Sequence, residues 1–210
     1  MTNDLEDHAA RFDEKAGEYD DELAPEHRAC VEQVVEHAAP NADDVVLDLG
    51  TGTGEIALAL ADDADAVIGR DISEVMLEQA RQKADERGIE NVEFGEGRFR
   101  DPGVDWDVSV VTTNFAMHHL ADEEKREAIA AIAALEPRRF VLGDIMLFGE
   151  EDSSTSFYGP EVDDPASVGV LADALTDAGF ALTAVEYVHD MAGVLVAERP
   201  GGAGNDQESA

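Results

Sequence analysis

The sequence predicts an α/β fold with a mainly parallel sheet, and three observations lead to this prediction. From residue 44 onward, short apolar runs alternate with amphipathic stretches. This alternation is typical of parallel strands joined by helices that cover the sheet. A glycine-rich loop follows the first apolar run, at the edge where such sheets bind ligands. Two final apolar runs around His189 and Asp190 predict a hairpin, which adds an antiparallel strand.

The strands are expected where the runs are short and rich in Val, Ile and Phe, because these side chains pack well on a pleated surface. The first run, DVVLDL, ends in glycines and is expected to be a buried strand. The parallel strands are expected over residues 44–49, 65–68, 92–94, 107–112 and 139–145. The hairpin is expected over residues 180–188 and 191–197.

The helices are expected between these strands, over residues 54–61, 73–87, 122–135 and 164–178. Ser73 is the expected N-cap of the second helix, because its side-chain oxygen can accept a hydrogen bond from the first helical turn. Asp164 is the expected cap of the last helix, with Pro165 in its first turn. The inner face of that last helix would carry Val168, Leu171, Leu175 and Ala178.

The chain of 210 residues suits one domain with a full core. We expect residues 1–40 to form a helical cap, residues 41–199 the α/β domain, and residues 200–210 a disordered tail. Residues 146–163 form a long connection after the fifth strand, and connections of that length often serve as lids or binding loops. We therefore expect residues 1–25 and 146–163 to close over the ligand.

The charge of the chain is extreme, with 49 acidic and 14 basic residues and a net charge of −35. The acids are spread along the chain, which favours a halophile-type surface over an acidic patch that recruits a basic partner. No cluster of Lys and Arg offers a nucleic-acid surface. No apolar run approaches the roughly 18 residues needed to span a membrane. The acidic N-terminus is unlike a secretory signal, so we expect a cytoplasmic protein.

The single cysteine, Cys30, excludes an internal disulfide and a multi-cysteine metal centre, and we expect no bound metal. Cys30 is expected to lie on the apolar face of a helix with Val31, Val34 and Val35 and to pack in the core.

The most specific motif is VLDLGTGTGE over residues 46–55, in which Gly50, Gly52 and Gly54 separate a strand from a helix. Glycines let a ligand approach bare N–H groups at a helix N-terminus. The spacing is not that of a dinucleotide fingerprint, since residue 55 is Glu, and no Gly-Lys-Ser/Thr follows as in a P-loop. The loop therefore favours a nucleoside ligand without a pyrophosphate. Asp71, after the second strand, lies at the same edge and can accept both hydroxyls of a ribose.

With these residues the chain resembles the class I S-adenosylmethionine-dependent methyltransferases of the small-molecule type. The resemblance is carried by residues 46–55, 67–73 and 105–120. It implies a Rossmann-like, doubly wound sheet of seven strands, the last antiparallel, with helices on both faces. It also implies that S-adenosyl-L-methionine is the cofactor and that residues 41–199 form the methyltransferase domain.

The resemblance assigns roles to particular residues. For the methionine part of the cofactor, it implies that Gly50, Thr51, Gly52 and Gly54 wrap it, that Asp48 lies by its amino group and that Asn114 faces the methionine end. For the nucleoside part, it implies that Asp71 holds the ribose and that Ile72 and Met76 pack on the adenine. It also implies that Tyr19 covers the cofactor. The family usually has an acid after the third strand that accepts from the adenine amino group. Here Arg98, followed by Phe99, takes that place, and arginine has no acceptor. Arg98 stacking on the ring or donating to it, and Glu96 as a substitute, are the alternatives.

Several residues are candidates for the acceptor side. His118 could act as a general base, because a histidine pKa lies near neutrality, whereas the alternative is that His118 and His119 cap and support the next loop. Asp144 would reach the pocket rim or satisfy loop backbone. Phe148, Phe157 and Tyr158 are expected to line the acceptor pocket or to anchor their loop. Glu150, Glu151 and Asp152 could bind a metal or a cationic substrate, but the acidic composition favours a solvated loop. The sequence lacks the Asn-Pro-Pro-Tyr/Phe and Pro-Cys motifs of nucleic-acid methyltransferases.

These observations predict an S-adenosylmethionine-dependent methyltransferase that acts on an unidentified small molecule, without nucleic acid or membrane as partner. Two rivals are carried forward. One is a non-catalytic methyltransferase-like subunit that binds cofactor and activates a partner. The other is an NAD-dependent oxidoreductase, which the glycine spacing disfavours. A monomer and a homodimer both fit the sequence.

Overall fold

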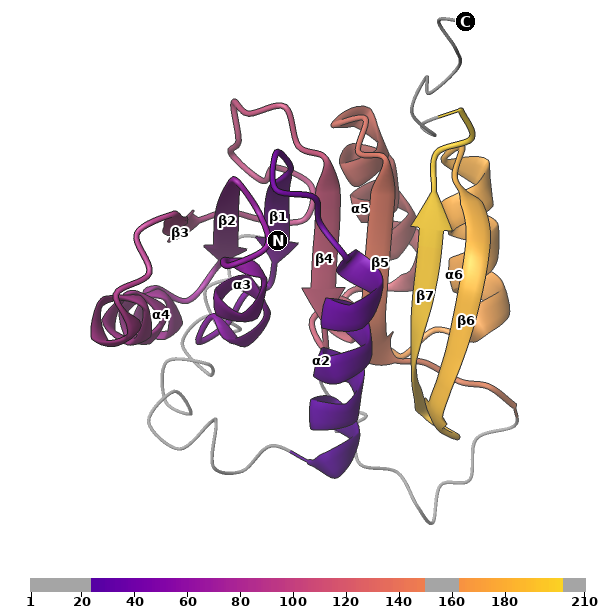
Figure 1. The fold of residues 1–210 in the computed structure, drawn as a ribbon. Helices are drawn as coiled ribbons and strands as arrows, with labels where there is room; N and C mark the ends of the chain where they lie inside the picture. The colour runs from indigo at the N-terminus through magenta and orange to yellow at the C-terminus, as the bar shows by residue number, and fades with distance from the viewer. Residues whose placement is uncertain (1–23, 150–162, 202–210) are drawn as a thin grey trace, which may run out of the picture.

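A seven-stranded sheet with helices on both faces organises the computed structural model, which describes residues 24–149 and 163–201 (Figure 1). The strand order is β3-β2-β1-β4-β5-β7-β6. The strands are β1 Val45–Leu49, β2 Ala66–Asp71, β3 Val92–Glu96, β4 Val110–Asn114, β5 Arg139–Ile145, β6 Ala181–His189 and β7 Ala192–Glu198. The helices are α2 Pro25–Ala38, α3 Glu55–Leu60, α4 Glu74–Arg87, the 3-10 turn η1 Met117–His119, α5 Asp122–Ala134 and α6 Val168–Asp177. The predicted fold class is confirmed.

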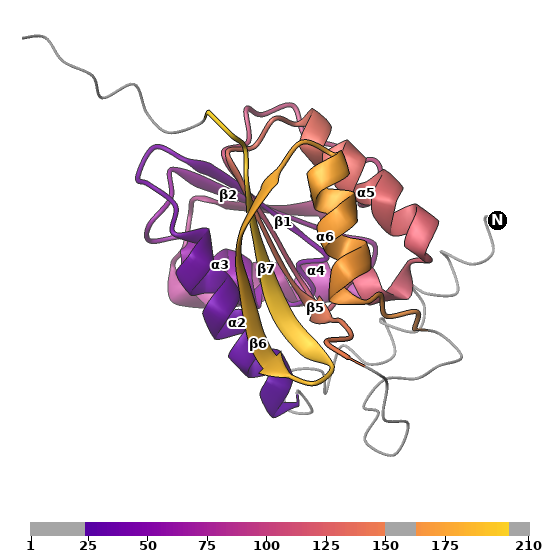
Figure 2. The same cartoon turned by 90° about the vertical axis from the view of Figure 1, so that its right-hand side faces the viewer.

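The helices form two layers, seen edge-on in Figure 2, with α2 and α3 on one side of the sheet and α5 and α6 on the other. Helix α4 joins the first layer and packs on β2 and β3. The apolar cores of the two layers are separate clusters, one on each face of the sheet. Cys30 belongs to the first core, and burial raises the pKa of its thiol to about 12, so it is a packing residue as expected.

The closing hairpin runs as predicted, with β7 antiparallel to both β5 and β6. β7 lies inside the sheet and is buried along almost its whole length, whereas β6 forms the edge and alternates between exposed and half-buried residues. This difference explains the sequences of the two strands, because an edge strand covered on one face needs apolar side chains only at every second position.

The element boundaries differ from the sequence prediction by up to four residues, and two of the differences have a clear structural cause. β4 begins at Val110, three residues later than expected, because Val110 is where the strand first pairs with β5 as well as β1. α6 begins at Val168 and is capped by the hydroxyl of Ser167, not by Asp164. The backbone N–H of Asp164 donates to the carbonyl of His118. The N–H of Val168, which would donate to the carbonyl of Asp164 in a helix that starts there, donates to the carbonyl of Leu147 instead.

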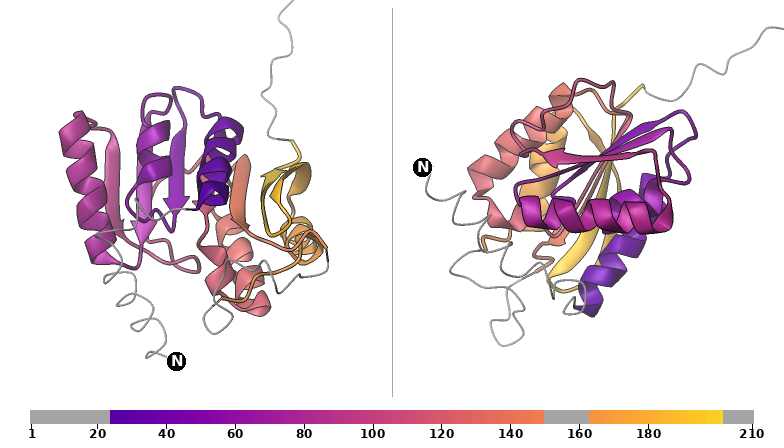
Figure 3. Two further views of the ribbon diagram at one scale, coloured as in Figure 1. Left: turned by 90° about the horizontal axis from the view of Figure 1, so that it is seen from below. Right: turned by 90° about the vertical axis from the view of Figure 1, so that its left-hand side faces the viewer.

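β1, β2 and β4 end at the lower edge of the sheet in Figure 1, and the left view of Figure 3 shows the molecule from below. β1 and β4 are neighbours there, and the chain leaves them toward opposite faces, through α3 and through η1 and α5. Such a switch in strand order leaves a crevice at the carboxyl ends of the strands, where α/β proteins bind ligands. In the described part of the chain, no helix has the length and apolarity needed to cross a membrane.

Candidate active site

The glycine loop turns sharply between β1 and α3. Gly50 and Gly52 have φ angles of +69° and +52°, a conformation that strains any residue with a side chain. The N–H groups of Gly50 and Thr51 donate to the carbonyl of Arg70, which fastens the loop to β2. A Cβ atom on Gly50 would lie 2.5 Å from the Cβ of Ala116, so the loop also abuts the segment that follows β4. The loop is a rigid frame between two strands.

Asp48 lies in β1 just below this loop and is only 2% exposed. Its two carboxylate oxygens accept hydrogen bonds from the hydroxyls of Thr51, at 2.6 Å, and Thr112, at 2.8 Å. Burial raises the pKa of Asp48 to about 6, and the negative charge of Asp71 adds to this, although the two hydroxyls act in the opposite direction. A cation placed beside this carboxylate would be stabilised, because it would relieve the cost of a buried negative charge.

Asp71 ends β2 and connects two ligand-facing segments. One carboxylate oxygen accepts from the N–H of Gly52 at 2.8 Å, and the other accepts from the N–H of Ser73 at 2.9 Å. Ser73 in turn caps α4 by accepting from the N–H of Met76, which confirms its predicted role as N-cap. The acid thus holds the glycine loop and the start of α4 in one arrangement.

A pocket opens over β1 and β4 beside these groups. It is lined by His27, Val31, Asp48, Gly50, Thr51, Gly52, Thr53, Glu55, Ile56 and Asn114. Five of the predicted cofactor residues therefore meet in one place, namely Asp48, Gly50, Thr51, Gly52 and Asn114. Asp71 is attached to this group through its hydrogen bond to Gly52.

The other predicted cofactor residues lie outside this lining. Gly54 packs the loop on the sheet, since a Cβ atom there would come within 3.0 Å of Ala80 and Phe94. Met76 is buried, and Ile72 is half-buried beside Asp71. Arg98 is exposed and lies 3.7 Å from Glu96, while Phe99 is half-buried with its ring near Gly50. Tyr19 lies outside the described residues, as do residues 150–152, Phe157 and Tyr158.

His27 is the pocket residue that the sequence interpretation missed. Its Nε2 atom lies 3.5 Å from the amide nitrogen of Asn114, and its ring meets the ring of Phe115 edge-on at 4.8 Å. A signal was available, because His27 precedes Cys30, Val31 and Val34 at helical spacing and so shares their buried face. A histidine at the end of the apolar face of a helix indicates that this end of the helix borders a pocket.

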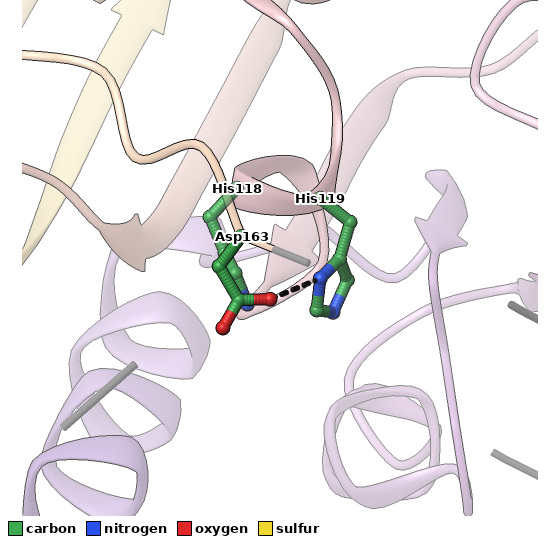
Figure 4. A group of neighbouring side chains, drawn as sticks. All are labelled: His118, His119 and Asp163. Atoms are coloured by element: carbon green, nitrogen blue, oxygen red, sulfur yellow. Dashed lines mark ion pairs between the residues drawn. The ribbon is translucent and has the colours of Figure 1, made fainter. Parts of the chain in front are cut away.

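A second cluster of polar side chains lies at the carboxyl ends of β4 and β5. The Nδ1 atom of His118 is 2.5 Å from a carboxylate oxygen of Asp144, and both side chains are buried. The Nδ1 atom of His119 is 2.8 Å from a carboxylate oxygen of Asp163, which also lies 3.9 Å from Nε2 of His118 (Figure 4). Burial lowers the pKa of His119, although the hydrogen bond with Asp163 opposes this shift.

Lys125 fixes the position of this cluster. Its side chain is 2% exposed, and its ammonium group donates to the carbonyls of Leu120 and Asp164. The N–H of Asp164 donates to the carbonyl of His118 at 2.7 Å. The residue next to Asp163 is thus tied to both ends of the histidine turn, and we call these contacts the Lys125 clamp.

Phe148, which we expected either to line the acceptor pocket or to anchor its loop, is an anchor. Its ring meets the ring of Tyr187 edge-on at 5.1 Å and lies over Gly193, where a Cβ atom would collide with it. The start of the long connection after β5 is therefore fastened to the β6–β7 hairpin.

Comparisons with known proteins identify the family. A domain family described as "Methyltransferase domain" matches residues 46–136. An uncharacterized methyltransferase of Oceanobacillus iheyensis is 31% identical over 150 residues, which cover 67% of this chain and 68% of the relative. An uncharacterized methyltransferase of Bacillus subtilis, YcgJ, is 32% identical over 134 residues, and the matched region spans only about half of that relative, 53%.

Solved structures agree with these relatives. The crystal structure of the Bacillus subtilis YcgJ protein covers 75% of this chain and 70% of that chain, with a TM-score of 0.64 and 26% identity. The methyltransferase in a complex with the Haloferax volcanii Trm112 activator covers 90% of this chain and 97% of that chain, with a TM-score of 0.76 and 21% identity, and so shares the fold. The chain therefore belongs to the class I S-adenosylmethionine-dependent methyltransferases.

Proposed function

We propose that this protein transfers the methyl group of S-adenosyl-L-methionine to a small-molecule acceptor. The observation that carries the proposal is the pocket over β1 and β4, in which Asp48, the glycine loop and Asn114 converge. The methionine ammonium of the cofactor would lie by Asp48 and relieve the cost of its buried charge. Asp71 would receive the ribose hydroxyls. Two N–H bonds hold its carboxylate in place at the same edge, and each oxygen keeps a second acceptor position for a hydroxyl.

Methyl transfer asks little covalent chemistry of the protein, because the sulfonium of the cofactor is already an activated donor. The chain would hold the two reactants in line and exclude water. A base is needed only if the acceptor must lose a proton, and His118 is our candidate. Asp144 fixes Nδ1 of His118, which leaves Nε2 as the ring atom that can accept a proton. Nε2 lies on the side of Asp163, at the carboxyl end of β4.

Residues 1–40 are proposed to cap the site. Of this range the structure describes residues 24–40, and α2 runs from Pro25 at the pocket edge, where His27 lies, across the sheet. We propose that residues 1–23, which lie outside the described part of the chain, complete the cap. Hydrogen exchange that slows in residues 1–23 when S-adenosylhomocysteine binds would support the cap, and unchanged exchange there would contradict it.

Calorimetry on the full chain in molar salt tests the proposed function. We expect binding of S-adenosylmethionine and S-adenosylhomocysteine, and none of NAD. Asp71→Ala should weaken binding by about 1–3 kcal/mol, the size of lost charge-assisted hydrogen bonds. The exposed Asp62→Ala, in the turn before β2, is the control with the same change of charge. Wild-type affinity in Asp71→Ala would remove Asp71 from the site, and tight NAD binding would favour the oxidoreductase.

Labelled cofactor incubated with extract fractions tests the acceptor class. We expect label in the metabolite fraction, because the described surface offers no cluster of basic residues for nucleic acid. Label in the RNA or protein fraction would contradict the small-molecule acceptor. Cofactor binding without turnover by the isolated chain in any fraction would favour the rival, a non-catalytic subunit.

A further inference from the structure

The histidine cluster has the composition and spacing of a metal site. A ring nitrogen of His118, a ring nitrogen of His119 and a carboxylate oxygen of Asp163 all lie within 4.8 Å of one another. Figure 4 shows the carboxylate of Asp163 reaching the ring of His119 and lying against His118. Metal–ligand bonds to such atoms are about 2.0–2.2 Å long, so donors around one cation lie roughly 3–3.5 Å apart. Small rotations of these side chains bring all three donors onto one ion.

We propose that His118, His119 and Asp163 bind one divalent transition-metal cation. Two imidazole nitrogens and one carboxylate oxygen suit ions such as Zn²⁺, Fe²⁺ or Ni²⁺, whereas Mg²⁺ and Ca²⁺ prefer all-oxygen ligands. Three protein ligands leave at least one coordination position for another molecule, as in catalytic metal sites.

The second shell supports this site. Asp144 accepts from Nδ1 of His118 at 2.5 Å, which directs Nε2 toward Asp163. A carboxylate on the far nitrogen of a ligating histidine fixes its tautomer and raises its basicity, and this partner commonly accompanies protein metal sites. The side chains of His118 and Asp144 are 6% and 3% exposed, so water does not compete for their contact.

The charge of the cluster points the same way. Two carboxylates, Asp144 and Asp163, lie among two imidazoles in a mostly buried place, with side-chain exposures of 3% to 14%. Buried carboxylates are costly unless positive charge accompanies them. A dication between the histidines would neutralise both carboxylates.

The Lys125 clamp preorganises the ligands. Asp163 is far from the histidines in sequence, yet its neighbour Asp164 is hydrogen-bonded to the carbonyl of His118 and to Lys125. The ligands are therefore held before a cation arrives, which lowers the entropic cost of binding. Resting on the proposed function, the open coordination position would take an acceptor with an oxygen or nitrogen donor. His118 would then act through the cation, and not as a direct base.

Metal titration of the full chain, stripped by a chelator and kept in molar potassium chloride, tests the proposal. We expect Zn²⁺ to bind with one strong site by calorimetry, and Co²⁺ to give the visible absorption of a nitrogen- and oxygen-coordinated ion. Mg²⁺ should not compete. His119→Gln and Asp163→Asn should abolish the strong site. Asp144→Asn should weaken it by about 10–100-fold, the usual effect of losing such a partner.

The matched controls are His189→Gln at the end of β6 and Asp190→Asn in the turn that follows, which are the same changes away from the cluster, and both should bind like the wild type. S-adenosylhomocysteine affinity is measured in parallel without metal, so that failure of the metal site and failure of the proposed function give different results. Absence of a strong site in the wild-type chain overturns the proposal and leaves His118 as a direct base. Equal binding by the cluster variants and the controls also overturns it, because it would reflect the acidic surface alone. The wild-type titration decides even if a variant does not fold.

Discussion

Two regions at the carboxyl ends of the strands, the pocket beside β1 and β2 and the histidine cluster beside β4 and β5, are built from different groups. On the β1–β2 side, a glycine loop presents backbone N–H groups. The carboxylate of Asp48 accepts from the hydroxyls of Thr51 and Thr112, and that of Asp71 accepts from two backbone N–H groups. On the β4–β5 side, the groups are side chains from three distant segments, and a buried lysine holds them together. The first side is a shape fixed by backbone conformation, and the second is a charge network fixed by tertiary contacts. Under the proposed function, the first region would be a constant frame for the cofactor, and the chemistry of the second could change without disturbing that frame.

Salt concentration should have the largest effect on the stability of the chain, and it should stabilise both regions alike. The net charge of −35 repels itself in dilute buffer, and molar salt reduces the Debye length to about 3 Å and strengthens apolar burial. We expect the melting temperature to rise steeply into the molar range, by more than any substitution below changes it. A melting temperature that is flat between dilute buffer and molar salt would contradict the halophile-type surface.

Gly50→Ala should break the cofactor side. It combines a strained φ of +69° with a Cβ atom placed 2.5 Å from Ala116, so we expect a loss of about 3 kcal/mol in unfolding free energy and loss of S-adenosylhomocysteine binding. Gly88→Ala is the matched control, since it has the same φ of +69° and open space around the new atom. It should cost about 1–2 kcal/mol and leave binding intact. Denaturant unfolding and calorimetry measure both, and equal losses in the two variants would contradict the close approach.

Lys125→Met should affect the other side alone. The variant leaves the carbonyls of Leu120 and Asp164 without their buried donor, which should cost about 2 kcal/mol of unfolding free energy. Lys83→Met on α4, where the lysine is half-buried, should cost less than about 0.5 kcal/mol. Calorimetry should show unchanged S-adenosylhomocysteine affinity in both variants. A weakened affinity in Lys125→Met would show that the two sides are coupled.

The pH dependence of cofactor binding should be a smaller effect. The raised pKa of Asp48, about 6, means that this carboxyl is largely protonated at pH 5, and a protonated Asp48 cannot pair with the methionine ammonium. Affinity should therefore fall about tenfold, or 1.4 kcal/mol, between pH 7.5 and pH 5. Asp48→Asn should bind more weakly and without this dependence. Calorimetry in buffers of different ionisation enthalpy should also detect proton release near pH 6, and a flat profile for the wild type would contradict the role of Asp48.

The raised pKa of Asp48 also makes the free energy of unfolding depend on pH. The folded chain binds this proton more tightly than the unfolded chain, whose Asp48 has its ordinary pKa of 3.8. The stabilising contribution of Asp48 is therefore present below pH 4 and is lost as the pH rises through about 6. Asp44 behaves in the opposite way. Its burial alone would raise its pKa, but hydrogen bonds from Arg138 and the backbone lower it overall, so its contribution is lost as the pH falls.

The arrangement beside β1 and β2 was more predictable from the sequence than that beside β4 and β5, because more of it is local. The loop over residues 46–55 carries its own strand, turn and helix start, and the cap by Ser73 depends on residues three positions apart. The meeting of His119 with Asp163 depends on how the chain returns after β5, which no short pattern encodes. The predicted start of α6 was wrong for the same reason, since tertiary hydrogen bonds to His118 and Leu147 hold the segment between Asp164 and Val168. His27 was missed because the apolar face of its helix was interpreted only as part of the core.

Lys125 also offers a built-in chemical reporter. The chain has three lysines, and this one is 2% exposed beneath the residues that join the histidine turn to Asp164. An amine-acylating reagent can reach its Nζ atom only when that contact opens, so the rate of modification, followed by mass spectrometry, measures the free energy of local opening. Half-buried Lys83 gives the reference rate in the same sample. Because the chain has so few lysines, the opening of the Lys125 clamp can be measured without introducing a probe into the protein.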